Sequence, residues 1–134
     1  MALSESFVNR HVKNWIDGWN NHDIKTVLSM YSENIEFSSP KVKVVFPDRT
    51  SSKINNKKEL EEYWSKALKN NFPSLNFMPK EVLIQENKIL LEYYATLDGK
   101  HRTSVIEKFE FQDQDGLIIK SSVFYGSEET ILMV

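Results

Sequence analysis

The stretch Thr103–Phe111, with the sequence TSVIEKFEF, alternates β-branched or aromatic residues with polar ones. A period of two is typical of a β-strand that buries one of its faces. The apolar face carries Glu107 in its middle, and its other members are Thr103, Val105, Phe109 and Phe111. A carboxylate among apolar side chains costs free energy unless it is paired, hydrogen-bonded or protonated. The pattern therefore predicts that Glu107 points into the protein, either toward a polar partner or into a pocket.

Four strand-like segments follow one another in the C-terminal half of the chain. They are Asn76–Gln85, Ile89–Leu97, Arg102–Gln112 and Leu117–Tyr125. The connections between them are short and contain Asn, Asp or Gly, as the turns of β-hairpins do. The four segments predict an antiparallel meander.

Three helices are predicted before the meander. The first begins after Ser4, a good N-cap, and weakens at Gly18–Asn21. The second begins after Asp23, and its apolar face extends to Tyr31. The third runs from Asn56 to about Asn70 and starts with a pattern like a capping box. Helices followed by a meander indicate an α+β fold.

The segment between the second and third helices is harder to interpret. A brief strand is predicted at Ile35–Ser38. In the following segment, Lys41–Ile54, apolar residues alternate at Val42, Val44 and Phe46. This alternation favours a short edge strand or a mobile flap, followed by a polar loop.

The composition narrows the class of protein. A length of 134 residues predicts a single domain, residues 1–134, and 40% hydrophobic with 27% charged residues is ordinary for a globular protein. The net charge of −2 gives no electrostatic reason to bind nucleic acid, and cysteine is absent. Neither a membrane-spanning run nor a signal peptide is recognised, so no membrane partner and a cytoplasmic location are expected.

Three blocks of the chain resemble the NTF2-like superfamily, in particular its SnoaL-like and ketosteroid-isomerase-like branch. They are Trp15–Pro40 (WIDGWNNHDIKTVLSMYSENIEFSSP), Lys57–Trp64 (KKELEEYW) and Val105–Gly126 (VIEKFEFQDQDGLIIKSSVFYG). The resemblance implies a cone-shaped fold in which three N-terminal helices pack on a strongly curved, mainly antiparallel β-sheet. It also implies a homodimer through the open sheet face. It does not select an activity, because this fold hosts enzymes and non-catalytic binders.

Ketosteroid isomerase moves a proton with a carboxylate base and stabilises the dienolate with a tyrosine and a protonated aspartic acid. The resemblance places Glu107 where that enzyme has its protonated acid. It places Ser39 where the base should be, and Trp15 where the tyrosine should be. Serine cannot take up a proton at neutral pH, and an indole N–H donates a hydrogen bond but is not an acid. Steroid isomerisation by that mechanism is therefore not expected.

The same resemblance implies a pocket with aromatic walls around Glu107. Its expected lining residues are Trp15, Trp19, Tyr31, Phe37, Ser39, Tyr63, Trp64, Phe109, Val123 and Tyr125. By its position in the last strand, Ser121 is also expected to point inward and to pair with Glu107 across the sheet. An aromatic cavity with few polar groups suits a small, flat, hydrophobic ligand.

Alternatives for Glu107 remain open at this point. The side chain can form an ion pair with Arg49, Arg102 or a lysine, or a bulge can turn it outward. If it is buried and unpaired, its pKa should be raised, which suits a hydrogen-bond donor or a general acid. The three histidines lack the spacing of a metal site, so no metal is expected, and only His101 is a candidate for the pocket rim. The chain has no Gly-rich phosphate loop, and no cofactor is expected.

Two functions from different classes follow. The first is a protein that binds a small hydrophobic molecule without catalysis. The second is a cofactor-independent isomerase, cyclase or dehydratase that uses Glu107 as general acid or base, assisted by Tyr31, Tyr63 or Tyr125. A less favoured third is a protein-interaction module that uses the sheet face. The apolar tail Ile131–Val134 is expected to cover the sheet or to enter a dimer contact.

Overall fold

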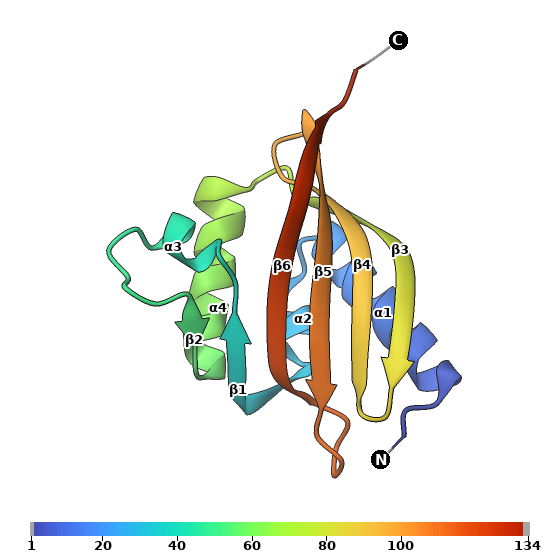
Figure 1. The fold of residues 1–134 in the computed structure, drawn as a ribbon. Coiled ribbons are helices and arrows are strands. Elements are labelled where there is room, and N and C mark those ends of the chain that lie inside the picture. The colour runs from blue at the N-terminus through green and yellow to red at the C-terminus, as the bar shows by residue number, and fades with distance from the viewer. Residues whose placement is uncertain (1, 133–134) are drawn as a thin grey trace.

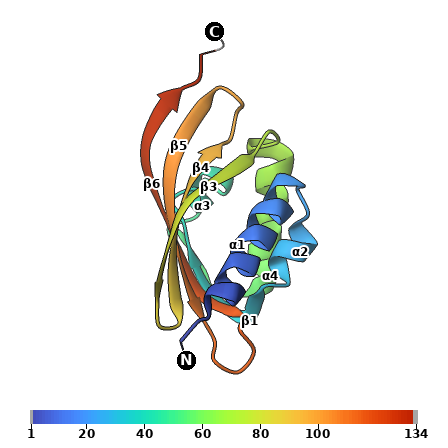
Figure 2. The ribbon, with the colours of Figure 1, turned by 90° about the vertical axis from the view of Figure 1, so that its right-hand side faces the viewer.

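One six-stranded, curved sheet runs through the computed structural model, which describes residues 2–132 (Figures 1 and 2). Its strands in chain order are β1 (Tyr31–Ser38), β2 (Lys53–Ile54), β3 (Asn76–Gln85), β4 (Lys88–Thr96), β5 (His101–Phe111) and β6 (Ile118–Thr130). The spatial order is β2-β1-β6-β5-β4-β3. β3 to β6 form the predicted antiparallel meander, whereas β1 pairs with β6 in parallel.

The helices lie on one face of this sheet. They are α1 (Glu5–Asn20), α2 (Ile24–Leu28), the short α3 (Val42–Val45), α4 (Lys57–Lys66) and a π-helical turn η1 (Ala67–Asn71) that continues α4. Figure 2 shows α1, α2 and α4 together inside the curve of the sheet. The α+β class and the curved, mainly antiparallel sheet are therefore confirmed.

Side-chain caps set the starts of the helices where the sequence predicts them. The Ser4 hydroxyl accepts a hydrogen bond from the Phe7 N–H at 3.1 Å, which satisfies one of the free amides of the first turn of α1. The Asn56 side chain accepts from the Glu59 N–H at 2.8 Å at the start of α4. Asp23 does the same for α2 through the Thr26 N–H.

The C-terminal end of α1 is fastened to the sheet by a pair of hydrogen bonds. The Asn20 side chain donates to the Phe77 carbonyl at 2.9 Å and accepts from the Phe77 N–H at 2.7 Å. The His22 ring adds a hydrogen bond to the Leu75 carbonyl. These contacts fix the distance between α1 and β3, and so the width of the space between helices and sheet.

Two predicted boundaries are wrong. The segment that begins at Val42 forms α3 instead of an edge strand or flap, because Val42 and Val45, three residues apart, are buried while Val44 is 48% exposed. Tyr31 starts β1 instead of ending the face of the second helix. With α3 and η1 included, the helical elements are more numerous than the three that the sequence predicts.

The C-terminal tail stays outside the core as far as the structure describes it. Ile131 and Leu132 are 41% and 78% exposed, and the rest of the predicted apolar tail, residues 133–134, lies outside the described residues. In residues 2–132, no helix combines the length and the hydropathy that a membrane crossing requires.

Candidate functional site

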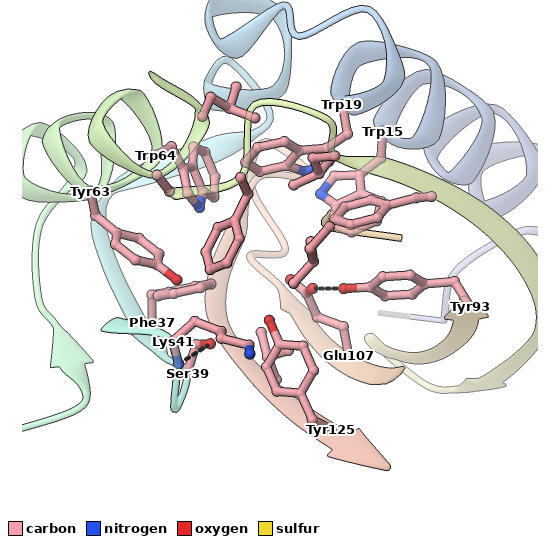
Figure 3. A pocket seen from close by; sticks show the side chains of 17 residues that line it. Trp15, Trp19, Phe37, Ser39, Lys41, Tyr63, Trp64, Tyr93, Glu107 and Tyr125 are labelled. Atoms are coloured by element: carbon pink, nitrogen blue, oxygen red, sulfur yellow. Dashed lines mark hydrogen bonds between the residues drawn. The ribbon is translucent and has the colours of Figure 1, made fainter. Parts of the chain in front are cut away.

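A cavity lies between the concave face of the sheet and the helical elements α1, α4 and η1, with Lys41, the residue before α3, at its edge (Figure 3). Its empty space is about 520 Å³ including the open solvent at its mouth. It is lined by Trp15, Trp19, Phe37, Ser39, Lys41, Tyr63, Trp64, Ala67, Leu68, Phe72, Leu75, Phe77, Tyr93, Leu97, Glu107, Val123 and Tyr125. All three tryptophans of the chain are among them.

Most of the residues predicted from the sequence meet at this cavity. The predicted residues found in its lining are Trp15, Trp19, Phe37, Ser39, Tyr63, Trp64, Glu107, Val123 and Tyr125. Three others lie behind the wall: Tyr31, Phe109 and Ser121 are buried and do not line it. Each of these three still touches a lining residue.

Glu107 points inward, as its place in β5 predicts, and is 4% exposed. Its Oε1 accepts a hydrogen bond from the Tyr93 hydroxyl at 2.9 Å, and its Oε2 accepts one from the Ser121 hydroxyl at 2.9 Å. The pairing of Ser121 with Glu107 is therefore confirmed. The register shifts of β5 lie at Thr103/Val105 and Glu110/Phe111, so no bulge turns Glu107 outward.

The ion pairs considered for Glu107 are absent from residues 2–132. Arg49 pairs with Glu59 at 3.0 Å, and Arg102 pairs with Glu129 at 2.6 Å. Burial raises the pKa of Glu107 to about 7, although the hydrogen bonds from Tyr93 and Ser121 favour the charged form. Near neutral pH the carboxyl group is therefore divided between its protonated and ionised forms.

The polar groups of Trp15 and Ser39 form hydrogen bonds within the protein. The Trp15 indole N–H donates to the Tyr31 hydroxyl at 3.0 Å, behind the cavity wall. The Ser39 hydroxyl accepts from the backbone N–H of Lys41 at 3.2 Å. Both polar groups are therefore engaged in hydrogen bonds within the protein.

A cluster of hydroxyl groups lies across the cavity from Tyr93. Tyr63 and Tyr125 come from α4 and β6, and burial raises the pKa of both phenols, while the nearby Ser39 hydroxyl opposes that rise. Both tyrosines are thus neutral hydrogen-bond donors at physiological pH. Figure 3 shows the hydroxyls of Tyr63 and Tyr125 and the carboxyl group of Glu107 directed into the same space.

Lys41 is the lining residue that sequence reasoning missed and that changes the chemistry most. Its ammonium lies 5.1 Å from the ring centroid of Tyr125 and 5.7 Å from that of Phe72. The sequence predicts a strand or flap for the segment Lys41–Ile54, and this prediction assigns no direction to the side chain of Lys41. Lys41 is the N-cap residue of α3, and its side chain lies in the cavity lining.

Other missed lining residues carry a signal that was available in the sequence. Tyr93 lies on the inward face of β4, at every second position together with Ile89, Leu91 and Ala95, all of which are buried. Phe77 is buried in β3, and its ring stacks on Trp15 with centroids 5.5 Å apart. Ala67, Leu68, Phe72, Leu75 and Leu97 complete the set.

The histidines take structural positions. His11 is buried in α1 against Phe7, Phe109 and Phe111, and burial lowers its pKa to about 4. His101 contacts Asp98 at 2.6 Å and is not part of the cavity lining, so the rim position predicted for it is wrong. Within the described residues, no group of three or more His, Cys, Asp or Glu side chains is placed to hold a metal ion.

Residues 12–121 match the family model of the SnoaL-like domain. The fold is similar to that of a SnoaL-like protein of unknown function from Burkholderia thailandensis. That protein is 26% identical, with a TM-score of 0.82, and the match covers 95% of this chain and 100% of that one. A search of the curated proteins found no match.

Two more distant solved structures share the fold. A putative ketosteroid isomerase from Kribbella flavida is 15% identical with a TM-score of 0.68, over 88% of this chain and 76% of that one. A putative polyketide cyclase from Sinorhizobium meliloti is 14% identical with a TM-score of 0.66, over 86% of this chain and 94% of that one. At these identities the likeness concerns the fold alone.

Proposed function

Because the chain belongs to the SnoaL-like domain family, we propose that it binds a small, flat, hydrophobic molecule in the aromatic cavity and anchors one oxygen atom of it on Glu107. The observation that supports the proposal is the position of Glu107. Among the described residues, 2–132, it is the only one with a carboxyl side chain in the cavity lining. A mostly apolar pocket with a few convergent polar groups is the usual form of a small-molecule site.

The protonated form of Glu107 supplies the polar contact. Tyr93 and Ser121 each occupy one acceptor position on the carboxyl group and thereby fix its orientation. Because the pKa is about 7, a carboxylic O–H is available near neutral pH. It can donate to a carbonyl or hydroxyl oxygen of the ligand, in surroundings from which water is largely excluded.

A matched pair of naphthalene probes tests this contact. Methyl naphthyl ketone carries an acceptor oxygen, whereas ethylnaphthalene has a similar shape without one. We expect the ketone to bind more tightly below pH 7 than above it, because ionised Glu107 cannot donate. Ethylnaphthalene should show a much weaker dependence. Calorimetric titration over this pH range gives both affinities.

Glu107→Gln is the matched variant for that experiment. Its side-chain amide still donates a hydrogen bond but does not titrate, so the ketone should bind with an affinity that no longer changes with pH. An unchanged pH dependence in Glu107→Gln would show that another group controls binding. Failure of both probes to bind the wild-type protein would overturn the proposed site.

The second candidate function is catalysis of proton transfer by Glu107. The observation in its favour is that the pKa of Glu107, about 7, lies where a general acid or base works best at physiological pH. The putative isomerase and cyclase among the structural neighbours share the fold that would hold such a group. In this candidate function the hydroxyls of Tyr63 and Tyr125, which are directed into the same space as Glu107 (Figure 3), would donate hydrogen bonds to a developing enolate.

Deuterium exchange separates this candidate from simple binding. In deuterium oxide, an enzyme that removes a proton next to a carbonyl group should accelerate exchange of the methyl protons of methyl naphthyl ketone, and proton NMR measures that rate. Glu107→Gln should keep the ketone bound and abolish the acceleration. If the exchange rate with the wild-type protein equals that in buffer, the catalytic candidate is refuted and only the binding function remains.

We also propose that two copies associate through the outer face of the sheet, which Figure 1 shows free of helices. Large apolar side chains are exposed on it: Met78, Leu83, Leu90, Ile106 and Phe124. Ile106 and Phe124 are direct cross-strand partners. Sedimentation should give a dimer for the wild-type protein and a monomer for Phe124→Lys. A monomeric wild-type protein contradicts this proposal.

A further inference from the structure

Lys41 places a positive charge in a cavity that is otherwise mostly apolar. Its side chain is only partly exposed, and within residues 2–132 its ammonium has no carboxylate within ion-pair distance. The faces of the Tyr125 and Phe72 rings hold it through cation–π contacts. Two aromatic faces position the charge without neutralising it, so the ammonium keeps its hydrogen-bond donors for another partner.

Hydrogen-bond donors surround the same point. Tyr125 contacts Lys41 through its ring, and its hydroxyl lies near that of Ser39, as does the hydroxyl of Tyr63. Burial keeps both phenols in the protonated, donating form at neutral pH. In Figure 3 the Lys41 ammonium and the Tyr63 and Tyr125 hydroxyls are all directed into the cavity. A cation with neutral donors beside it is the arrangement that binds an anion.

Glu107 does not fill this role of partner. Its carboxyl group is bound by Tyr93 and Ser121, from β4 and β6, and burial favours its neutral form. The cavity therefore contains two polar groups with different requirements, the Lys41 ammonium and the Glu107 carboxyl group. Lys41 attracts a negative group, and protonated Glu107 donates to a neutral oxygen.

We propose that the ligand of this cavity is a flat organic carboxylate whose charged group binds the Lys41 ammonium and the hydroxyls of Tyr63 and Tyr125. This rests on the proposed function, since it names the chemical class of the molecule held beside Glu107. The aromatic walls contact the flat body, and a second oxygen of the ligand, in a ring or a carbonyl group, reaches Glu107. A neutral hydrocarbon would leave the Lys41 charge unpaired in a partly desolvated site, which costs free energy.

The test compares naphthoate with naphthamide, which share shape and differ in charge. Nitrogen–proton correlation spectra follow the indole N–H signals of Trp15, Trp19 and Trp64, all from the cavity wall. Measured at about pH 6, where Glu107 is mostly protonated, naphthoate should bind about tenfold more tightly than naphthamide. This is the lower end of what a hydrogen bond to a charged group contributes.

Three variants assign that preference to Lys41. Lys41→Met should reduce the affinity for naphthoate to that for naphthamide, while Lys41→Arg should keep most of the preference because the charge remains. Lys43→Met is the matched control, because Lys43 lies two residues after Lys41, in α3, and is exposed. It should bind both probes as the wild-type protein does.

The outcomes separate this inference from the function on which it rests. If naphthamide shifts the indole signals and naphthoate binds no more tightly, the inference that the ligand is a carboxylate is overturned. The proposed site for a hydrophobic molecule is then retained. If Lys41→Met keeps the preference for naphthoate while its spectrum remains that of a folded protein, Lys41 is not the anion partner and the inference is overturned. If neither probe shifts the signals, the proposed function fails, and this inference fails with it.

Discussion

The space between helices and sheet contains two regions built from the same kinds of residue. Around His11, which is 6% exposed, the rings of Phe7, Phe109 and Phe111 pack against the imidazole and one another, edge to face or stacked. Around Glu107, a larger number of aromatic residues lines a hollow. Aromatic content alone therefore does not decide whether a region is core or cavity.

The polar group at the centre of each region differs in its partners. His11 Nε2 is buried and, within residues 2–132, has no hydrogen-bond partner. Glu107 has two hydrogen bonds and faces open space. The filled region thus holds its titratable group as a neutral packing element, whereas the hollow region fixes the orientation of its group. Such preorganisation is what a binding or catalytic site requires.

Truncating one ring in each region should give the largest difference. Phe109 is fully buried and contacts both His11 and Trp15, so Phe109→Ala should destabilise the protein by about 4 kcal/mol through the cavity it leaves. Phe72 lines the mouth of the hollow and is only partly buried, so Phe72→Ala should cost about 1 kcal/mol. Urea unfolding measures both, and Phe109→Leu provides a milder change if Phe109→Ala does not fold. Equal losses would mean that the two regions are packed alike.

The two regions should also contribute differently to the pH dependence of stability. The first contribution comes from Glu107. Its folded pKa, about 7, lies above its ordinary value of 4.5, so between these pH values the folded state binds more protons than the unfolded state. The contribution of Glu107 to stability therefore falls as pH rises through this window, by about 3 kcal/mol in total. Glu107→Gln should remove that fall, as denaturant unfolding at a series of pH values will show. A variant that still loses stability in this window would contradict the raised pKa.

The opposite slope is expected from His11. Burial lowers its folded pKa from 6.5 to about 4, so in this window the unfolded state binds more protons and stability falls as pH decreases. The effect of His11 is again about 3 kcal/mol. In the wild-type protein the two effects oppose each other across most of the window. His11→Leu should therefore reveal the slope of Glu107, and Glu107→Gln the slope of His11, when the same unfolding series is measured for both. Parallel slopes in the two variants would refute this assignment.

The sequence predicted the meander and the direction of Glu107 because both depend on local periodicity. Alternation in β5 places Glu107 inward whatever the rest of the fold does, and short Asn, Asp and Gly turns join consecutive strands. The resemblance to the NTF2-like superfamily predicted the cone-shaped fold and most of the expected residues of the cavity wall. Tyr93 was within reach of the same parity argument, because every second residue of its strand is buried.

The remainder depended on tertiary packing. The segment at Val42 reads equally well with a period of two or of three to four, and only the burial of Val42 and Val45 selects a helix. The position of the Lys41 side chain in the cavity was not predicted for the same reason. Tyr31 and Phe109 were expected in the wall, but they lie one layer behind it, under Trp15. A sequence pattern distinguishes inward from outward, but it does not distinguish a residue that fills a core from one that lines a cavity.

The smallest effect expected is a change in the pKa of Glu107 when one of its donors is removed. The Tyr93 hydroxyl favours the ionised carboxyl group, so Tyr93→Phe should raise the pKa of Glu107 above its wild-type value of about 7. The loss corresponds to one hydrogen bond to a charged group, on the order of 1 kcal/mol. Carbon NMR titration of the Glu107 carboxyl group measures it directly. Tyr94→Phe is the matched control, because Tyr94 is the next residue in β4 and packs against Arg102 instead. A pKa that stays unchanged in Tyr93→Phe would mean that the hydroxyl of Tyr93 does not orient Glu107, and the distinction between the filled and the hollow region would lose its main support.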